Sequence, residues 1–273
     1  MTRARALAAS AMVLAARLAA AAPQPEAGIG LPRDVSRDGH HVDALIHFTL
    51  AAVVVIYAVV LAAMLWAIFR HGRSHRAEHQ PGSRATVGLL VAALLVIGVA
   101  VDGSLLVRTL RDMNQIFWNF ETVDRRPDAV RIEVNARQWA WTARYPGPDG
   151  TFGTADDVVT TNDIRIPVGR PIVLQIASID VIHSLYLPNF RVKRDAVPGM
   201  VNALWFQAEK TGEYEIGCAQ HCGPNHYKMR GVLTVLQPDE YRRWIAEMGG
   251  DARRGSDPDD KEASWAWEWR RDM

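Results

Sequence analysis

The sequence predicts a membrane hairpin of two α-helices followed by a β-rich domain, and three observations support this fold class. Two long apolar runs lie within the first 110 residues. A short arginine-rich segment separates them. From about Ala129 onward, the pattern changes to short alternating segments bounded by turn residues. The 273 residues carry a net charge of +1, so overall charge indicates no nucleic-acid partner.

Each apolar run is long enough to cross a bilayer. Residues 47–69 contain no charged side chain, and residues 85–107 contain one, Asp102. About 20 apolar residues in an α-helix span the hydrocarbon core of a membrane. The segment between the runs carries four Arg and one Glu, which marks it as cytoplasmic. We therefore expect a transmembrane hairpin over residues 46–110 with both ends outside the cytoplasm and Asp102 reaching the outer interface.

The N-terminus has the pattern of an export signal. Residues 1–22 have a basic start, an apolar middle and a small-residue end, which predicts a secretory signal peptide cleaved near Ala22. An uncleaved N-terminal helix is the alternative. Residues 23–45 are polar and contain Pro and Gly, so we expect a periplasmic segment there.

The second half of the chain predicts a sandwich or barrel of short strands. We expect strands over residues 130–134, 138–145, 164–166, 172–176, 201–206, 212–216 and 232–235. A helix should begin at Pro238 and end near Met248, because Gly249 and Gly250 follow. Residues 249–273 are charged and predicted to be flexible, and they contain three alternating tryptophans that could rest on a membrane or a partner: Trp265, Trp267 and Trp269.

One stretch, residues 218–229, carries metal-ligand chemistry. It holds the only two cysteines, and Cys218, Cys222, His226 and Met229 follow one another at intervals of four, four and three residues. Gly223-Pro224 lies between them and favours a loop over a helix. Thiolate, imidazole and thioether together favour copper, and two thiolates could bridge a pair of coppers. A disulfide or a zinc site is the alternative.

These residues resemble a known family. The pattern Cys-x-x-x-Cys-Gly-x-x-His-x-x-Met is similar to the dinuclear copper (CuA) loop of cytochrome c oxidase subunit II. Three further signatures of that family occur in the same order, and the resemblance covers roughly residues 40–248. They are Gln138-Trp139-Ala140-Trp141, Asp180-Val181-Ile182-His183-Ser184 and Asp195-Ala196-Val197-Pro198-Gly199.

The resemblance implies a fold and a ligand set. Residues 111–248 should form a periplasmic, cupredoxin-like Greek-key β-sandwich whose last two strands are joined by the copper loop. The two thiolates should bridge two coppers. One copper should also take an imidazole and a thioether, and the other an imidazole and a backbone carbonyl. The implied ligands are Cys218 and Cys222 as bridges, His183 with Met229, and His226 with the Gln220 carbonyl; His221 is not a ligand.

The resemblance also implies a function. The chain would be subunit II of a respiratory haem–copper oxidase in a bacterial inner membrane, with its copper domain on the outer side. It would accept electrons from a c-type cytochrome through Trp139 and pass them to the haem of subunit I, where oxygen is reduced to water. Trp139 and Trp141 are expected to alternate on one strand and share a face.

Several features stay open at the sequence level. Many family members have Glu where this chain has Gln220, which leaves a magnesium ion at the boundary with subunit I undecided; Asp195 could still act there as a polar partner. The acidic loop from Asp149 to Asp157, together with Asp163, could be a plain solvated loop or a cytochrome docking site, and the order of residues within the loop would also suit calcium.

Three rival functions are considered. A quinol oxidase subunit II keeps the fold but lacks the copper ligands. A membrane-anchored copper-binding or delivery protein would not need the tryptophan motif. Nitrous oxide reductase has a similar loop but a much longer chain. No Cys-x-x-Cys-His motif occurs, so no c-type haem is expected on this chain.

Overall fold

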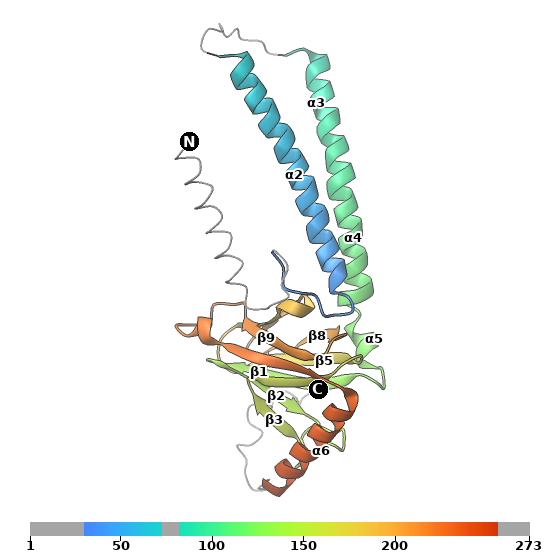
Figure 1. Ribbon diagram of the computed structural model, residues 1–273, viewed down its shortest axis with the longest axis vertical. Coiled ribbons are helices and arrows are strands. Elements are labelled where there is room, and N and C mark those ends of the chain that lie inside the picture. Colours follow the sequence, from blue (N-terminus) through green and yellow to red (C-terminus); the bar gives the residue numbers. More distant parts are fainter. Residues whose placement is uncertain (1–29, 73–81, 256–273) are drawn as a thin grey trace, which may run out of the picture. The chain divides into compact units, whose positions relative to one another are not determined.

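The structure, a computed structural model, describes residues 30–72 and 82–255. These residues divide into two compact units, a helical unit over His40–Glu121 and a β unit formed by the residues on either side of it. Figure 1 shows the elements of both units. The predicted signal peptide and the three tail tryptophans lie outside the described residues.

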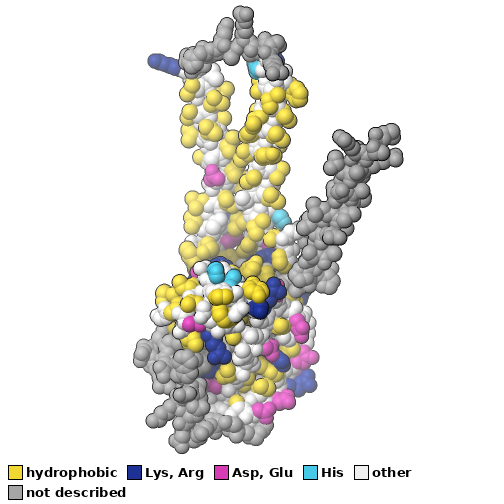
Figure 2. Space-filling view, turned by 90° about the vertical axis from the view of Figure 1, so that its left-hand side faces the viewer, with side chains coloured by type: hydrophobic (Ala, Val, Ile, Leu, Met, Phe, Trp, Pro, Cys, Tyr) yellow, Lys and Arg dark blue, Asp and Glu magenta, His cyan; other side chains and the backbone are white. Residues whose placement is uncertain are grey.

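The helical unit consists of two long helical stretches. α2 runs over Gly39–Arg70. The second stretch comprises α3 (Arg84–Ile97), a π-helical segment (Gly98–Gly103), α4 (Ser104–Asp112), a second π-helical segment (Met113–Phe117) and, after a turn, α5 (Phe120–Asp124). Both stretches are long and apolar enough to cross a membrane by length and composition. Hydrophobic side chains cover their surface (Figure 2), as expected of helices that face lipid or other membrane helices.

Contacts near the outer ends pair the two helices as a hairpin. The Arg108 guanidinium lies 4.9 Å from the ring centre of Phe48. His41 Nδ1 lies 3.5 Å from Asp112 Oδ1, which joins the start of α2 to the end of α4. Both helices continue beyond the predicted limits of 46 and 110, because polar turns at their outer ends stay helical. Asp102 lies exposed within the first π-helical segment.

The β unit is a sandwich of two five-stranded sheets. One sheet has the order β3-β2-β1-β5-β8 and the other β4-β10-β9-β6-β7. Parallel pairing of β1 with β5 and of β10 with β4 gives the crossed connections of a Greek-key arrangement. The strands are β1 (Val130–Arg137), β2 (Ala140–Tyr145), β3 (Val158–Thr161), β4 (Asp163–Pro167), β5 (Pro171–Ser178), β6 (His183–Leu187), β7 (Val192–Ala196), β8 (Asn202–Gln207), β9 (Gly212–Cys218) and β10 (Arg230–Leu236).

Alternating side chains from both sheets fill the core. Val134, Trp141, Ile176, Ile216 and Leu233 are all fully buried. Burial of apolar surface at about 25 cal/mol per Å² is the main stabilising contribution in such a core. The sandwich therefore forms a rigid frame for the loops at its ends.

Seven strands agree with the predicted ranges to within a few residues, and the structure corrects the rest. β3, β6 and β7 were not predicted. The strand predicted over 138–145 begins only at Ala140, because residues 138 and 139 form the turn between β1 and β2. The prediction that Trp139 and Trp141 share a strand face is therefore wrong.

Residues before the first helix belong to the sandwich. The Val35 backbone N–H donates to the Asn189 carbonyl at 3.0 Å, and the Glu209 N–H donates to the Val35 carbonyl at 2.9 Å. Ser36 and Ala208 form an antiparallel bridge. Val35 is buried, so this short segment packs as part of the β unit.

The C-terminal helix is longer than predicted. α6 runs over Pro238–Gly255, although Gly249 and Gly250 were expected to end it, and residues 249–255 are thus not a flexible tail. A Cβ at Gly249 would lie 2.6 Å from Pro148 Cδ and 3.1 Å from the Asp156 carbonyl oxygen. Glycine at this position permits close contact of the helix with the 146–157 loop, and the helix continues through it.

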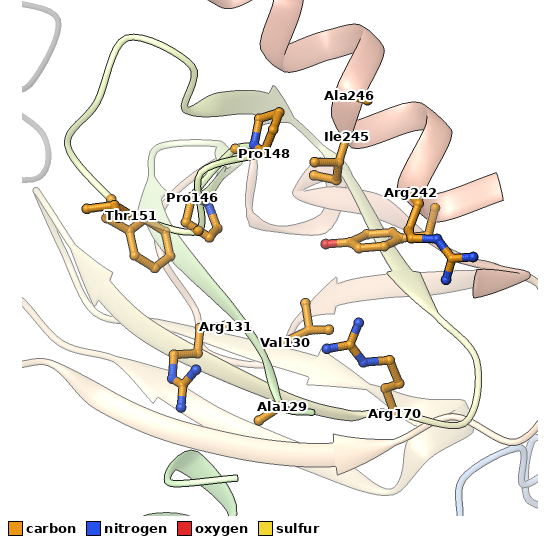
Figure 3. A pocket seen from close by; sticks show the side chains of 14 residues that line it. Ala129, Val130, Arg131, Pro146, Pro148, Thr151, Arg170, Arg242, Ile245 and Ala246 are labelled. Atoms are coloured by element: carbon orange, nitrogen blue, oxygen red, sulfur yellow. The ribbon is translucent and has the colours of Figure 1, made fainter. Parts of the chain in front are cut away.

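A cavity of about 850 Å³ lies between α6, the start of β1 and the loop after β2 (Figure 3). Arg131, Arg170 and Arg242 line it. Each guanidinium already bonds to an oxygen of a neighbouring aspartate residue. The lining contains no Cys, His or acidic side chain, so the candidate metal ligands lie elsewhere.

Candidate metal centre

The connection between β9 and β10 holds two unbonded thiols. β9 ends at Cys218 and β10 begins at Arg230, as expected for a loop between the last two strands. Cys218 Sγ and Cys222 Sγ lie 3.8 Å apart. A disulfide needs about 2.05 Å, so both cysteines are free thiols. Cys222 is buried and Cys218 half-buried.

Three further donor groups of the same loop surround the thiols. Met229 Sδ lies 3.8 Å and His226 Nδ1 lies 3.6 Å from Cys222 Sγ. The Gln220 carbonyl oxygen lies 3.2 Å from Cys218 Sγ. A short 3-10 turn over His226–Lys228 turns the chain back to β10. The loop thus gathers thiol, imidazole, thioether and carbonyl groups around one point.

The sixth group, His183, comes from another strand. β6 begins at His183 and pairs with β9 through Leu185 and Cys218. The ligand atoms of His183, Cys218 and Cys222 lie within 4.8 Å of one another. His183 Nε2 lies 2.8 Å from Asp180 Oδ1. Its Nδ1 is buried and has no hydrogen-bond partner in the described part of the chain, which leaves this nitrogen available to a metal.

The neighbouring groups shift the pKa values of the two thiols in opposite directions. Burial raises the pKa of Cys218, but the nearby His183 imidazole and the Ser184 backbone outweigh it, and the pKa falls below the usual value. Burial and the neighbouring Cys218 both raise the pKa of Cys222. For His183, burial lowers the pKa, while Cys218 and Asp180 raise it more strongly. Cys218 thus ionises first, and Cys222 needs a compensating cation to lose its proton.

This set of donors fits copper. Two thiols, two imidazoles and a thioether are soft or intermediate ligands, and Met is rare at zinc sites. The buried Nδ1 of His183 lies beside the two thiols, which are 3.8 Å apart, so the three groups could hold a metal ion together. The residues present therefore fit a copper centre.

Trp139 lies against the thiol loop. Its indole Nε1 donates a hydrogen bond to the Cys222 carbonyl at 3.2 Å, and its ring is partly exposed. Trp141, by contrast, is fully buried in the core, with its ring centre 6.1 Å from that of His183. The two tryptophans therefore have different environments: Trp139 is partly exposed beside the thiol loop, and Trp141 is buried beside His183.

The remaining predicted residues are also located. His221 is exposed, and its Nδ1 accepts a hydrogen bond from the Gly223 N–H. Asp195 Oδ1 accepts from Ser184 Oγ at 2.7 Å, beside the start of β6. In the acidic loop, the carboxylates of Asp149, Asp156 and Asp157 accept hydrogen bonds from the loop's own backbone and Thr154.

Sequence reasoning missed two residues that support the ligands. Asp180 holds His183, and Gln138 donates from its side chain to the Cys222 carbonyl at 2.8 Å. Both lie within the quoted motifs. Spacing alone gave them no role, since the partner of Gln138 lies 84 residues away and the contact of Asp180 with His183 depends on the turn before β6.

Comparisons with known proteins place the sequence in a family. The family described as "Cytochrome C oxidase subunit II, periplasmic domain" matches residues 130–236. The alternative cytochrome c oxidase subunit 2 of Bradyrhizobium diazoefficiens is 30% identical over 240 residues, which cover 76% of this chain and 80% of that relative. Cytochrome c oxidase subunit 2 of Cereibacter sphaeroides is 25% identical over 280 residues, covering 87% of this chain and 88% of that relative. A solved structure, the periplasmic domain of subunit II of cytochrome oxidase from Bradyrhizobium japonicum, is 28% identical with a TM-score of 0.40, covering 45% of this chain and 94% of that one.

Proposed function

Because this chain belongs to the cytochrome c oxidase subunit II family, and is thus a subunit of a haem–copper oxidase, we propose that its thiol loop holds two copper ions. With copper held there, the chain would accept electrons from a c-type cytochrome and pass them to subunit I. When bound, the copper pair supplies the ability to take up and release one electron at a time. Oxygen reduction itself takes place in subunit I.

One observation carries the proposal. Two free thiols lie 3.8 Å apart, with a thioether, an imidazole and a buried, unbonded imidazole nitrogen beside them. A copper-less quinol oxidase subunit has no need of these groups, and a disulfide does not account for His226 and Met229.

The residues take different parts in this function. Cys218 and Cys222 would hold both ions as thiolates. His183 and Met229 would bind one of them, and His226 with the Gln220 carbonyl would bind the other. Asp180 accepts a hydrogen bond from His183 Nε2 and so keeps Nδ1 directed at the metal.

Trp139 is the residue at which electrons enter. The support is its partly exposed ring and its hydrogen bond to the Cys222 carbonyl, which connects the surface to a thiolate ligand. The acidic 149–157 loop follows Tyr145, at the opposite end of β2 from Trp139, so its carboxylates are not part of this entry point. His226, on the loop between β9 and β10, is the ligand through which electrons leave toward subunit I.

The proposal places the protein in a bacterial inner membrane. The two helices cross it, and the β unit with the metal lies on the outer side, because the arginine-rich connection favours the cytoplasm. We make no magnesium assignment.

The test is copper loading of the full chain in detergent. We expect two coppers per chain and an EPR hyperfine pattern from one unpaired electron shared by two nuclei. Cys222→Ser should lose both. His226→Asn should also disturb the signal, whereas the neighbouring His221→Asn, a matched control, should leave it unchanged. One copper per chain, or a hyperfine pattern from a single nucleus, would contradict the proposal.

A further inference from the structure

The turn between β1 and β2 reaches across the sandwich to the metal loop. β1 belongs to the first sheet, whereas all six candidate ligands lie on or between strands of the second. Gln138 occupies this turn and makes two short hydrogen bonds. Its side-chain Nε2 donates to the Cys222 carbonyl at 2.8 Å, and its backbone N–H donates to Asp180 Oδ2 at 2.6 Å.

The Cys222 carbonyl is held by two donors. Gln138 Nε2 and Trp139 Nε1 both donate to it, at 2.8 and 3.2 Å. A carbonyl oxygen has two lone pairs, so these bonds use its full accepting capacity. They fix the peptide plane that follows Cys222 and thereby limit the positions open to its Sγ.

The loop is shaped to admit this contact. Gly223 has φ +114°, a conformation that other residues rarely adopt. A Cβ there would lie 2.9 Å from Gln138 Nε2 and 3.2 Å from Trp139 Cζ2. Only glycine lets the loop lie this close to both side chains.

The second bond reaches the other ligand segment. Asp180 accepts from the Gln138 N–H with Oδ2, and its Oδ1 lies 2.8 Å from His183 Nε2 and accepts from the Val181 N–H. Gln138 is therefore connected to a loop ligand through its side chain and to a strand ligand through its backbone.

We propose that Gln138 is a positioning residue that holds the two ligand segments, with Trp139, in a single rigid arrangement. This inference deepens the proposed function and rests on it. Preorganised ligands let a centre change charge with little rearrangement, so loosening one ligand segment slows electron uptake even where the metal stays bound.

An alternative role for Gln138 is contact with the electron donor, since the residue is exposed. The two roles predict different kinetics. A positioning residue alters the metal spectrum and kcat, whereas a docking residue alters KM for the cytochrome and leaves the spectrum unchanged.

The test compares three single variants of the subunit within the assembled oxidase. Gln138→Leu keeps size but removes the donor, and Gln138→Glu keeps shape but directs a carboxylate at the carbonyl. Gln237→Leu is the matched control, because Gln237 is an exposed glutamine at the far end of β10. We expect both Gln138 variants to keep two coppers per chain, with altered hyperfine splitting and about tenfold slower electron uptake at unchanged KM.

The outcomes separate the two proposals. Unchanged spectra and uptake rates in both Gln138 variants, or a raised KM with an unchanged spectrum, would overturn the positioning role while leaving the copper centre intact. If Gln138→Leu fails to assemble, Gly223→Ala, which leaves Gln138 itself in place, should show the same altered splitting. Absence of a copper pair in the unaltered protein would instead refute the proposed function.

Discussion

A buried ion pair between β1 and β2 permits a quantitative prediction. Glu133 and Arg144 are directly opposite each other in the antiparallel register. Glu133 Oε2 accepts from Arg144 Nε and Nη2, both at 2.7 Å. The Glu133 side chain is 0% exposed and that of Arg144 8% exposed. Burial lowers the pKa of Arg144 despite the nearby Asp157 carboxylate, which reflects the cost of placing the cation there.

Arg144→Met removes the cation but keeps much of the side-chain volume. It leaves a carboxylate in a site without solvent, and breaking such a buried pair costs about 3–5 kcal/mol. For a domain of this size, each kcal/mol lowers the melting temperature by roughly 3 °C, so a fall of about 10–15 °C is expected. The double variant Glu133→Leu/Arg144→Met should recover much of this loss, because the fully buried Glu133 carboxylate is gone, while Asp157, which also pairs with Arg144 at 3.5 Å, keeps its hydrogen bond from the Gly153 N–H.

The measurement is thermal unfolding of the copper-free full chain in detergent, followed by near-UV circular dichroism. Asp128→Asn provides the control, since its pair with Arg126 is exposed on both sides and should not change the melting temperature measurably. A loss below about 1 kcal/mol for Arg144→Met, or a double variant less stable than the single one, would show that the pair is not desolvated as the structure has it.

Three further predictions concern the same unit. Burial raises the pKa of Tyr145 in the folded protein. The contribution of its neutral phenol to the unfolding free energy is therefore fully present below about pH 10, the ordinary tyrosine value, and is lost above that pH as Tyr145 of the unfolded chain ionises. The fall in unfolding free energy at alkaline pH should be smaller in Tyr145→Phe. Gly249→Val should destabilise by about 1–3 kcal/mol in denaturant unfolding, because its Cβ would meet Pro148, and an unchanged midpoint would count against that contact. Calcium should not raise the melting temperature, because the carboxylates of the 149–157 loop already accept internal hydrogen bonds. Asp156→Ala should lower the unfolding free energy by about 1–3 kcal/mol. A rise in melting temperature with calcium would contradict the assignment of this loop as one held by its own hydrogen bonds.

The sequence missed β6 and β7, whose burial shows no regular alternation. β7 has three consecutive exposed residues between two buried ones, and β6 is buried at four of five positions. Neither pattern has the period of two that marks a half-buried strand. Their existence follows from pairing with β9 and with each other, which is a tertiary property.

Some residues of the candidate site were predicted from the sequence, and others are revealed only by the fold. Five of the predicted ligands lie in one stretch; spacing suggested a common centre for four of them, and the Gln220 carbonyl was added through the family resemblance. His183 was assigned through the family resemblance, because its approach to Cys218 depends on β6 pairing with β9. Gln138 and Asp180 received no role, since their partners lie 84 and 3 residues away and only the fold shows which atoms meet. Trp139 stays a predicted electron-entry residue, and its position in a turn was not foreseen.

The pairing of Val35 with Asn189 and Glu209 has a consequence for how the chain is threaded. In the sequence, Val35 precedes both long helices and its two partners follow them, yet they share backbone hydrogen bonds. Any bilayer that α2 crosses must therefore be recrossed before Thr122, or the sandwich cannot close. An even number of crossings is thus required by hydrogen bonding in the β unit itself, independently of the arginines between the helices.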